Sequence, residues 1–330
     1  MVVLVAGEPN ESMDVQHHPY YQFASSTSQL LFGTKPITVT SFFDFLTELK
    51  DGHDKIYGVE GNKRTELKLK YCQLLADYMW IVTFLCVAYV IAVHGLRMII
   101  KKPFRSLKPL LIAWNFSLSV FSILGAFIST RWLISMASTY GFRSTLCVRP
   151  SYMDTFGSSG DVWIGVYFVM SKVAEMLDTI FKVLMMRKVI FLHWYHHLMT
   201  CWVAWYSIAH GFGPGIWYAS INFSVHGLMY PYFFLSSVLP KSQFKKISLL
   251  VAPIITTLQI IQMGWFLFVA GTSYYLKHFD VAGGGCDITD HTIYTIMVVI
   301  FSYMVLFGMF FVKKYMRVEE SHLISSKKNK

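Results

Sequence analysis

Apolar and polar residues occur in long blocks along this sequence, and seven of the blocks are mainly apolar. Each of these blocks is about 20 residues long, which is the length that an α-helix needs to cross the apolar core of a bilayer. They predict membrane-spanning helices at 78–98, 110–130, 162–184, 189–209, 216–238, 248–270 and 292–312. Because the connections are short, consecutive helices should lie antiparallel. The predicted fold class is therefore an all-α membrane protein with a seven-transmembrane-helix bundle.

Lysine and arginine residues gather in every second connection and predict the orientation of the bundle. They are frequent after the first, third, fifth and seventh predicted spans, and cytosolic connections carry this excess in membrane proteins. The connection at 131–161, which is predicted to be lumenal, departs mildly from this pattern because it has three arginines beside two aspartates. We expect a lumenal N-terminus and a cytosolic C-terminus. The net charge of +10 then reflects topology, and no nucleic-acid partner is expected.

Composition divides the chain into three regions. The 330 residues are 54% hydrophobic and 15% charged, so most of the chain is suited to lipid. A soluble domain usually carries about 25% charged residues. We predict a polar lumenal segment at 1–70, a seven-helix domain at 71–315 and a cytosolic basic tail at 316–330.

The predicted lumenal side contains a candidate disulfide and a candidate N-glycosylation site. Cys147 and Cys286 lie in different non-cytosolic connections, where an oxidising environment permits a disulfide, and two free thiols are the alternative. Asn10 begins an Asn-Glu-Ser acceptor for N-glycosylation. Both expectations depend on the predicted orientation.

The fourth predicted span contains three histidines within five residues. His193, His196 and His197 are spaced i, i+3 and i+4, so they lie on one face of a helix over a single turn. Titratable groups are costly at membrane depth, and they normally face the bundle interior and mark function. Three interpretations are open at this point: a metal site, acid–base or nucleophilic chemistry, and a buried polar network.

Polar residues at helical spacing also interrupt three other predicted spans. They are Lys172, Glu175 and Asp178 in the third span, Asn222, His226 and Tyr230 in the fifth, and Thr256, Gln259 and Gln262 in the sixth. Such residues can simply hold helices together, because buried polar groups need partners. Their depths coincide with that of the histidines, however, which predicts one shared site that opens toward the cytosol and continues into an apolar interior. A substrate with a charged head and a long apolar tail fits that shape.

These motifs, in this order, resemble the fatty acid elongase (ELO) family of very-long-chain 3-oxoacyl-CoA synthases, from about residue 70 to residue 315. The match rests on Lys172-x-x-Glu175-x-x-Asp178-Thr179, His193-x-x-His196-His197, His226-x-x-Met229-Tyr230-x-Tyr232 and Thr256-x-x-Gln259-x-x-Gln262. The third motif departs from the family, because Phe233 follows Tyr232 where a second tyrosine is usual. Pro231 also stands where serine is common.

The resemblance implies a multi-pass enzyme of the endoplasmic reticulum membrane that needs no cofactor or metal. It would condense a long-chain acyl-CoA with malonyl-CoA to a 3-oxoacyl-CoA two carbons longer, releasing CO₂ and CoA. The implied partners are the reductase and dehydratase of the elongation cycle, and assembly of the chain with copies of itself is left open. Lys327 and Lys328 resemble a di-lysine signal for retrieval to this membrane, and a solvated basic tail is the alternative.

Our mechanistic hypothesis places the acyl group on an imidazole of the histidine box. His196 is the predicted nucleophile, His226 assists, and His193 and His197 orient it or share protons with Asp178. Asn222, Gln259 and Gln262 would donate hydrogen bonds to a thioester or enolate oxygen. The supporting residues are Lys172, Glu175 and Tyr230.

Two other classes of protein compete with this interpretation. A di-iron desaturase or hydroxylase would need several histidine boxes, whereas the predicted spans offer one box and His226. A seven-helix receptor or transporter fits the predicted topology, although its polar site would not be expected to open toward the cytosol.

Overall fold

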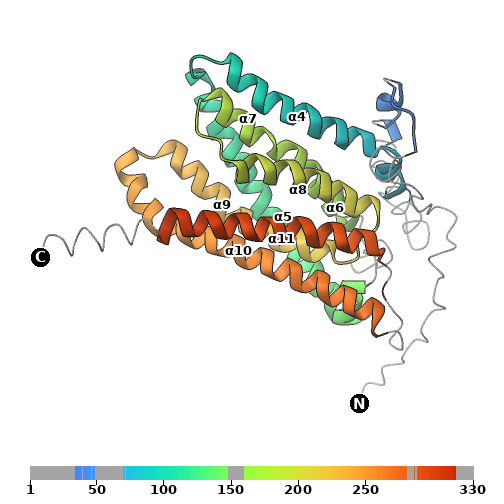
Figure 1. Ribbon diagram of the computed structural model, residues 1–330. Coiled ribbons are helices and arrows are strands. Elements are labelled where there is room, and N and C mark those ends of the chain that lie inside the picture. Colours follow the sequence, from blue (N-terminus) through green and yellow to red (C-terminus); the bar gives the residue numbers. More distant parts are fainter. Residues whose placement is uncertain are drawn as a thin grey trace, which may run out of the picture.

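The computed structural model describes residues 34–38, 40–45, 47, 48, 70, 72–147, 160–280, 286 and 288–316, with side chains from residue 164 onward in the third of the long ranges. The regular structure of this described part is entirely helical. The main helices are α4 (Met79–Ile99), α5 (Lys108–Cys147), α6 (Gly160–Glu175), α7 (Leu177–Leu184), α8 (Phe191–Ala209), α9 (Gly215–Val238), α10 (Lys241–His278) and α11 (Asp290–Phe311). They pack side by side as a bundle, which confirms the all-α prediction (Figure 1).

Four helical stretches are long and apolar enough to cross a bilayer. Among the described residues they are Met79–Ile99, Arg105–Cys147, Lys241–His278 and Asp290–Met316. The chain is therefore a multi-pass membrane protein. The other helices of the bundle are shorter or carry more polar residues, and the candidate site lies mainly on these.

Helices α5 and α10 extend well beyond the predicted spans at 110–130 and 248–270. Their 40 and 38 residues correspond to about 60 Å and 57 Å of helix, twice the roughly 30 Å of a bilayer core. The sequence pattern marked only the apolar part of each helix, because the helical backbone continues through polar residues at the ends. Helix α5 also bends at Gly141, which has a φ of 82° that glycine tolerates without steric cost.

The predicted span at 162–184 is divided into two helices. Helix α6 ends at Glu175 and α7 begins at Leu177, so the interruption at Met176 falls between two charged positions of one motif. The Thr179 amide N–H bonds to the Met176 carbonyl across the junction. This places Asp178 on a separate short helix from Lys172 and Glu175.

Helix α8 lies between the two largest clusters of buried apolar side chains. One cluster joins α4, α6 and one side of α8, including Val82, Val169 and Trp205. The other joins α10, α11 and the opposite side of α8, including Leu192 and Ile300. Because α8 is packed on both sides, the histidines at its start are held at the centre of the bundle.

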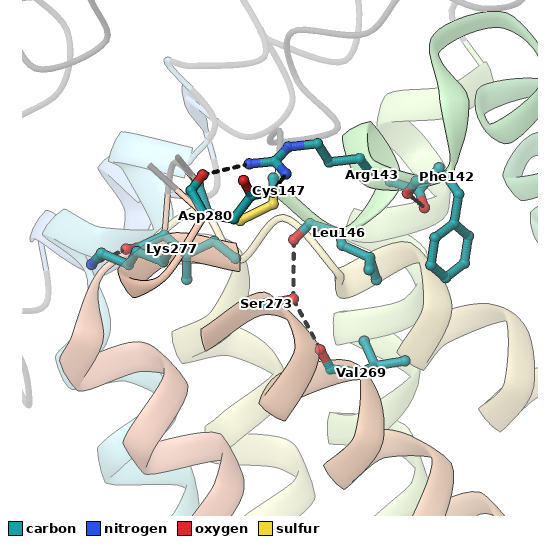
Figure 2. The surroundings of a disulfide bond; sticks show 11 residues. Phe142, Arg143, Leu146, Cys147, Val269, Ser273, Lys277 and Asp280 are labelled. Carbon is teal, nitrogen blue, oxygen red and sulfur yellow. Dashed lines mark hydrogen bonds and ion pairs between the residues drawn. A yellow bond between two sulfur atoms is a disulfide. The ribbon is translucent and has the colours of Figure 1, made fainter. Parts of the chain in front are cut away.

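A disulfide fastens one end of the bundle. Cys147, the last residue of α5, is bonded to Cys286, which precedes α11, so the two cysteines expected to pair are joined here (Figure 2). Arg143 forms an ion pair with Asp280 beside them, and the Ser273 hydroxyl donates to the Leu146 carbonyl oxygen at 3.2 Å. The end of α5 is therefore tied to the end of α10 and the start of α11. Asn10, Lys327 and Lys328 lie outside the described residues.

Candidate active site

The three histidines of α8 form a compact group on one turn of the helix, as their spacing predicted. The ring centroids of His193 and His197 are 4.7 Å apart, and those of His196 and His197 are 5.5 Å apart. His197 is buried and the other two are half-buried. Within the described part of the chain, no three His, Cys, Asp or Glu side chains are arranged to hold one metal ion.

Two residues that the sequence motifs did not reveal hold this group in place. Lys182 Nζ lies 3.3 Å from His193 Nδ1, within hydrogen-bond distance. The Tyr303 hydroxyl lies 3.0 Å from Thr200 Oγ1 and donates to the His196 carbonyl oxygen at 3.3 Å. The rings of His196 and Tyr303 are also in contact, with centroids 4.9 Å apart. Helix α11 therefore fixes the middle histidine, while α7 contacts the first.

A buried charged network connects α6 with α9. Lys172 Nζ donates to Glu175 Oε1 and to Asn222 Oδ1, both at 2.7 Å, and it also lies 4.5 Å from the centre of the Phe168 ring. The side chains of Lys172 and Glu175 are only 1% and 4% exposed. A buried ion pair is stable only when its remaining hydrogen-bond capacity is also satisfied, and Asn222 supplies that acceptor here.

The same network orients His226 on α9. Asn222 Nδ2 lies 3.4 Å from His226 Nε2, and Glu175 Oε1 lies 3.6 Å from His226 Nδ1. The second distance is too long for a hydrogen bond, and His226 Nδ1 is a buried atom without a hydrogen-bond partner among the described residues. Lys172 thus positions Asn222, which in turn contacts His226 Nε2, while His226 Nδ1 faces the Glu175 carboxylate.

Asp178 has different partners from those we expected. Its Oδ1 accepts a hydrogen bond from Trp114 Nε1 at 2.7 Å, and its Oδ2 accepts one from the Tyr230 hydroxyl at 2.9 Å. Both carboxylate oxygens are thus bonded, by a half-buried donor on α5 and a buried donor on α9, and the expected sharing of protons with His193 and His197 is not seen. The indole and the phenol both need an acceptor in the core, and Asp178 supplies it.

The glutamines of α10 line the site without joining the network. Gln259 Nε2 lies 3.4 Å from the Met229 sulfur atom, and Thr256 Oγ1 donates back to its own helix at Ala252. Gln262 is buried, and its Oε1 has no hydrogen-bond partner in the described part of the chain. This amide oxygen is therefore free to accept a hydrogen bond from a substrate.

Two cavities of different chemistry meet at His196. One spans about 1360 Å³, which includes space open to solvent, and its polar lining includes Asp178, Lys182, Lys188, His193, His196, His197, His226, Thr256, Gln259, Gln262 and Lys314. We call this the polar cavity. The other spans about 1340 Å³, again including space open to solvent, is lined mainly by apolar side chains and reaches Cys72, Leu75 and Trp132. We call this the apolar cavity. His196, Gln262 and Met263 line both.

Comparison with known proteins explains this combination of residues. The family model "ELO: GNS1/SUR4 family" matches residues 74–323. The chain belongs to this family. The resemblance that the four sequence motifs indicated is therefore confirmed, and the family places the protein among the enzymes of fatty acid elongation.

Relatives from distant organisms match most of the chain. "Fatty acid elongase 3" of Trypanosoma brucei brucei is 34% identical over 240 residues, which are 66% of this chain and 76% of the relative. "Very long chain fatty acid elongase 6" of Drosophila melanogaster is 33% identical over 246 residues, or 74% of each chain. "Long chain fatty acid elongase 1" of Caenorhabditis elegans is 34% identical over 247 residues, or 74% of this chain and 81% of the relative.

Proposed function

We propose that this ELO-family protein condenses a long-chain acyl-CoA with malonyl-CoA. The product is a 3-oxoacyl-CoA that is two carbons longer, and CO₂ and free CoA are released. The observation that carries the proposal is the position of His196, whose side chain lines both the polar and the apolar cavity. An acyl-CoA has the same division, with a polyanionic head, a long apolar tail and the reactive thioester between them.

The two cavities suit the two halves of such a substrate. Lys182, Lys188 and Lys314 line the polar cavity and can bind phosphate groups through charge-assisted hydrogen bonds. The apolar cavity can take the acyl chain, and each buried CH₂ group contributes roughly 0.8 kcal/mol. The thioester carbonyl would then lie near His196 and Gln262, which line both cavities.

The first step of the proposed reaction is acyl transfer to the enzyme. An imidazole nitrogen of His196 attacks the thioester carbon, the C–S bond breaks and CoA leaves as its thiol after taking up a proton. Hydrogen bonds from Gln262 and Asn222 would stabilise the oxyanion that develops. His226, which lines the polar cavity together with His196, would accept and return the proton.

The second step forms the new carbon–carbon bond. Malonyl-CoA loses CO₂ and leaves the enolate of acetyl-CoA, whose carbon attacks the acyl carbon on His196. The C–N bond breaks, the 3-oxoacyl-CoA forms and the imidazole is regenerated. His193 and His197 would orient His196. They would not share protons with Asp178, because both of its oxygens accept hydrogen bonds from Trp114 and Tyr230.

The same proposal includes the predicted topology and location. If α6 and α7 together cross the membrane once, the described helices make seven passes, with 1–70 lumenal, 71–315 in the bundle and 316–330 cytosolic. The polar cavity and its lysines would then face the cytosol, where acyl-CoA and malonyl-CoA are found. The disulfide would face the oxidising lumen of the endoplasmic reticulum. A reductase and a dehydratase of the same membrane would process the 3-oxo product.

Microsomes that express the full chain test this proposal. The rate of malonyl-CoA-dependent elongation of palmitoyl-CoA is measured for the wild type, for His196→Ala and for the control His94→Ala, which alters an exposed histidine of α4 that lines neither cavity. We expect His196→Ala to reduce the rate at least about a hundredfold, and mass spectrometry to find an acyl adduct on the wild-type peptide that contains His196. Full activity of His196→Ala would exclude the nucleophile role.

A further inference from the structure

An aromatic side chain from outside the family-matched region is buried in the core of this protein. The match to the family begins at residue 74, whereas Phe45 lies well before it and is only 4% exposed. Its ring centroid lies 5.3 Å from that of Tyr78 and 5.7 Å from that of Trp205. The neighbouring Phe42 and Phe43 are 39% and 61% exposed, so Phe45 alone of the three is inserted.

The segment that carries Phe45 is attached to the start of α4 at several points. We call residues 34–38, 40–45, 47 and 48 the N-terminal strap; in Figure 1 it is the blue segment beside the start of α4. The backbone N–H groups of Thr34 and Lys35 both donate to the Asp77 carbonyl oxygen at 3.1 Å. The Tyr78 hydroxyl donates to Glu48 Oε1 at 3.3 Å. These bonds hold the strap on either side of Phe45 in sequence.

Phe45 packs against residues that support one wall of the apolar cavity. Cys72 and Leu75 form part of that wall. Trp205 Nε1 donates to the Leu75 carbonyl oxygen at 2.9 Å, and Leu75, Tyr78, Trp205 and Phe45 belong to the same cluster of buried side chains. The strap therefore supports this wall indirectly: Phe45 packs against Trp205, and Trp205 is hydrogen-bonded to Leu75.

This wall is far from the reacting group. Trp205 follows His196 by nine residues on α8, which corresponds to about 14 Å along a helix. Between them Thr200, Val203 and Ala204 line the apolar cavity. A tail that starts at His196 and follows α8 thus runs along the wall of Cys72 and Leu75, at the level where Ser207 and Ile208 also line the cavity.

We propose that Phe45 is a positioning residue that limits acyl chain length, because the N-terminal strap holds the far wall of the apolar cavity in place. The inference rests on the proposed acyl-CoA condensation. Removing the Phe45 ring leaves a void behind Tyr78 and Trp205, and the surrounding structure collapses only partly into such a void. The wall of Cys72 and Leu75 can then move outward and admit further CH₂ groups.

The test compares Phe45→Ala with Phe43→Ala, which removes the same side chain from an exposed position of the same strap. Elongation rates of the full chain in microsomes are measured on palmitoyl-, stearoyl-, arachidoyl- and behenoyl-CoA. For Phe45→Ala we expect the rate on behenoyl-CoA relative to that on palmitoyl-CoA to rise about tenfold, which is the effect of admitting roughly two CH₂ groups. Phe43→Ala should keep the wild-type profile.

A second variant, Phe45→Leu, keeps the test valid if Phe45→Ala fails to fold. Phe45→Leu keeps an apolar side chain at the site, so it should accumulate normally and shift the profile in the same direction by a smaller factor. An equal fall in rate on all four substrates, or an unchanged profile in both Phe45 variants, would overturn the inference. Absence of malonyl-CoA-dependent product from the wild type would instead overturn the proposed reaction, so the two failures are distinct.

Discussion

The polar and apolar cavities meet at His196, but they are built in different ways. Around the polar cavity, lining side chains are held by hydrogen bonds, such as those of Asp178 and Lys182. The wall of the apolar cavity at Leu75 is fixed by packing and by one indole-to-backbone bond. Substitutions near the first should therefore alter rate and stability, and substitutions near the second should alter which tail is accepted.

The largest effect is expected from breaking the buried Lys172–Glu175 pair. Lys172→Met leaves the Glu175 carboxylate buried without its cation, which should lower the free energy of unfolding by about 3–5 kcal/mol. Activity should fall with it, because Asn222 loses its lysine donor. Urea unfolding in detergent and the elongation assay measure the two quantities.

The control for this variant is Lys277→Met. Lys277 Nζ also lies 2.7 Å from a carboxylate, that of Asp290, but the two side chains are 24% and 44% exposed. An ion pair that water reaches contributes only about 0–1 kcal/mol. Equal losses in the two variants would show that burial does not govern the strength of the Lys172–Glu175 pair.

A smaller loss is expected from Tyr230→Phe. Without the phenol hydroxyl, Asp178 Oδ2 loses its donor in the core, which should cost about 1–3 kcal/mol of stability. Tyr232→Phe is the matched control on the same helix, since its hydroxyl bonds to Ser248 in a less buried place. Thermal unfolding of both variants is the measurement. A larger shift in Tyr232→Phe would contradict the structural role given to Asp178.

Much of this site could be predicted from the sequence, because four of the predicted spans carry polar residues at helical spacing among apolar ones. His196, His226 and Gln262 were identified in that way. Trp114 and Tyr303 were not, since one more aromatic residue in an apolar span gives no signal. Phe45 could not be found either, because its burial depends on where a polar N-terminal segment folds back. The partners of Asp178 were predicted wrongly, since spacing along one helix does not say which other helix supplies the donors.

A kinetic effect of moderate size is expected at the mouth of the polar cavity. Lys314→Ala removes an exposed cation from its lining, whereas the adjacent and equally exposed Lys313 does not line it. If Lys314 binds phosphate, its loss should raise the KM for palmitoyl-CoA about fivefold at low salt, and added salt should reduce the difference. Lys313→Ala should leave KM unchanged. A fall in kcat at constant KM would place Lys314 outside the phosphate site.

The smallest effect is expected from one added methyl group in the apolar cavity. A Cβ at Gly165 would lie 3.2 Å from the Ile208 Cδ1 atom, closer than most Cβ contacts, and both residues line the cavity. Gly165→Ala should therefore narrow the path of the tail. The rate on behenoyl-CoA relative to that on palmitoyl-CoA should fall about fourfold, which is the effect of excluding roughly one CH₂ group.

The control for this change is Gly264→Ala on α10, where an added Cβ meets no described atom within 4 Å. Its profile of elongation rates should equal that of the wild type. Gly165→Ala and Phe45→Ala act on the same cavity in opposite directions, so in the double variant the two shifts should partly cancel. If Gly165→Ala instead lowers the rates on short and long acyl-CoA substrates equally, the apolar cavity does not hold the tail. The assignment of the acyl tail to the apolar cavity and of the CoA head to the polar cavity would then be wrong.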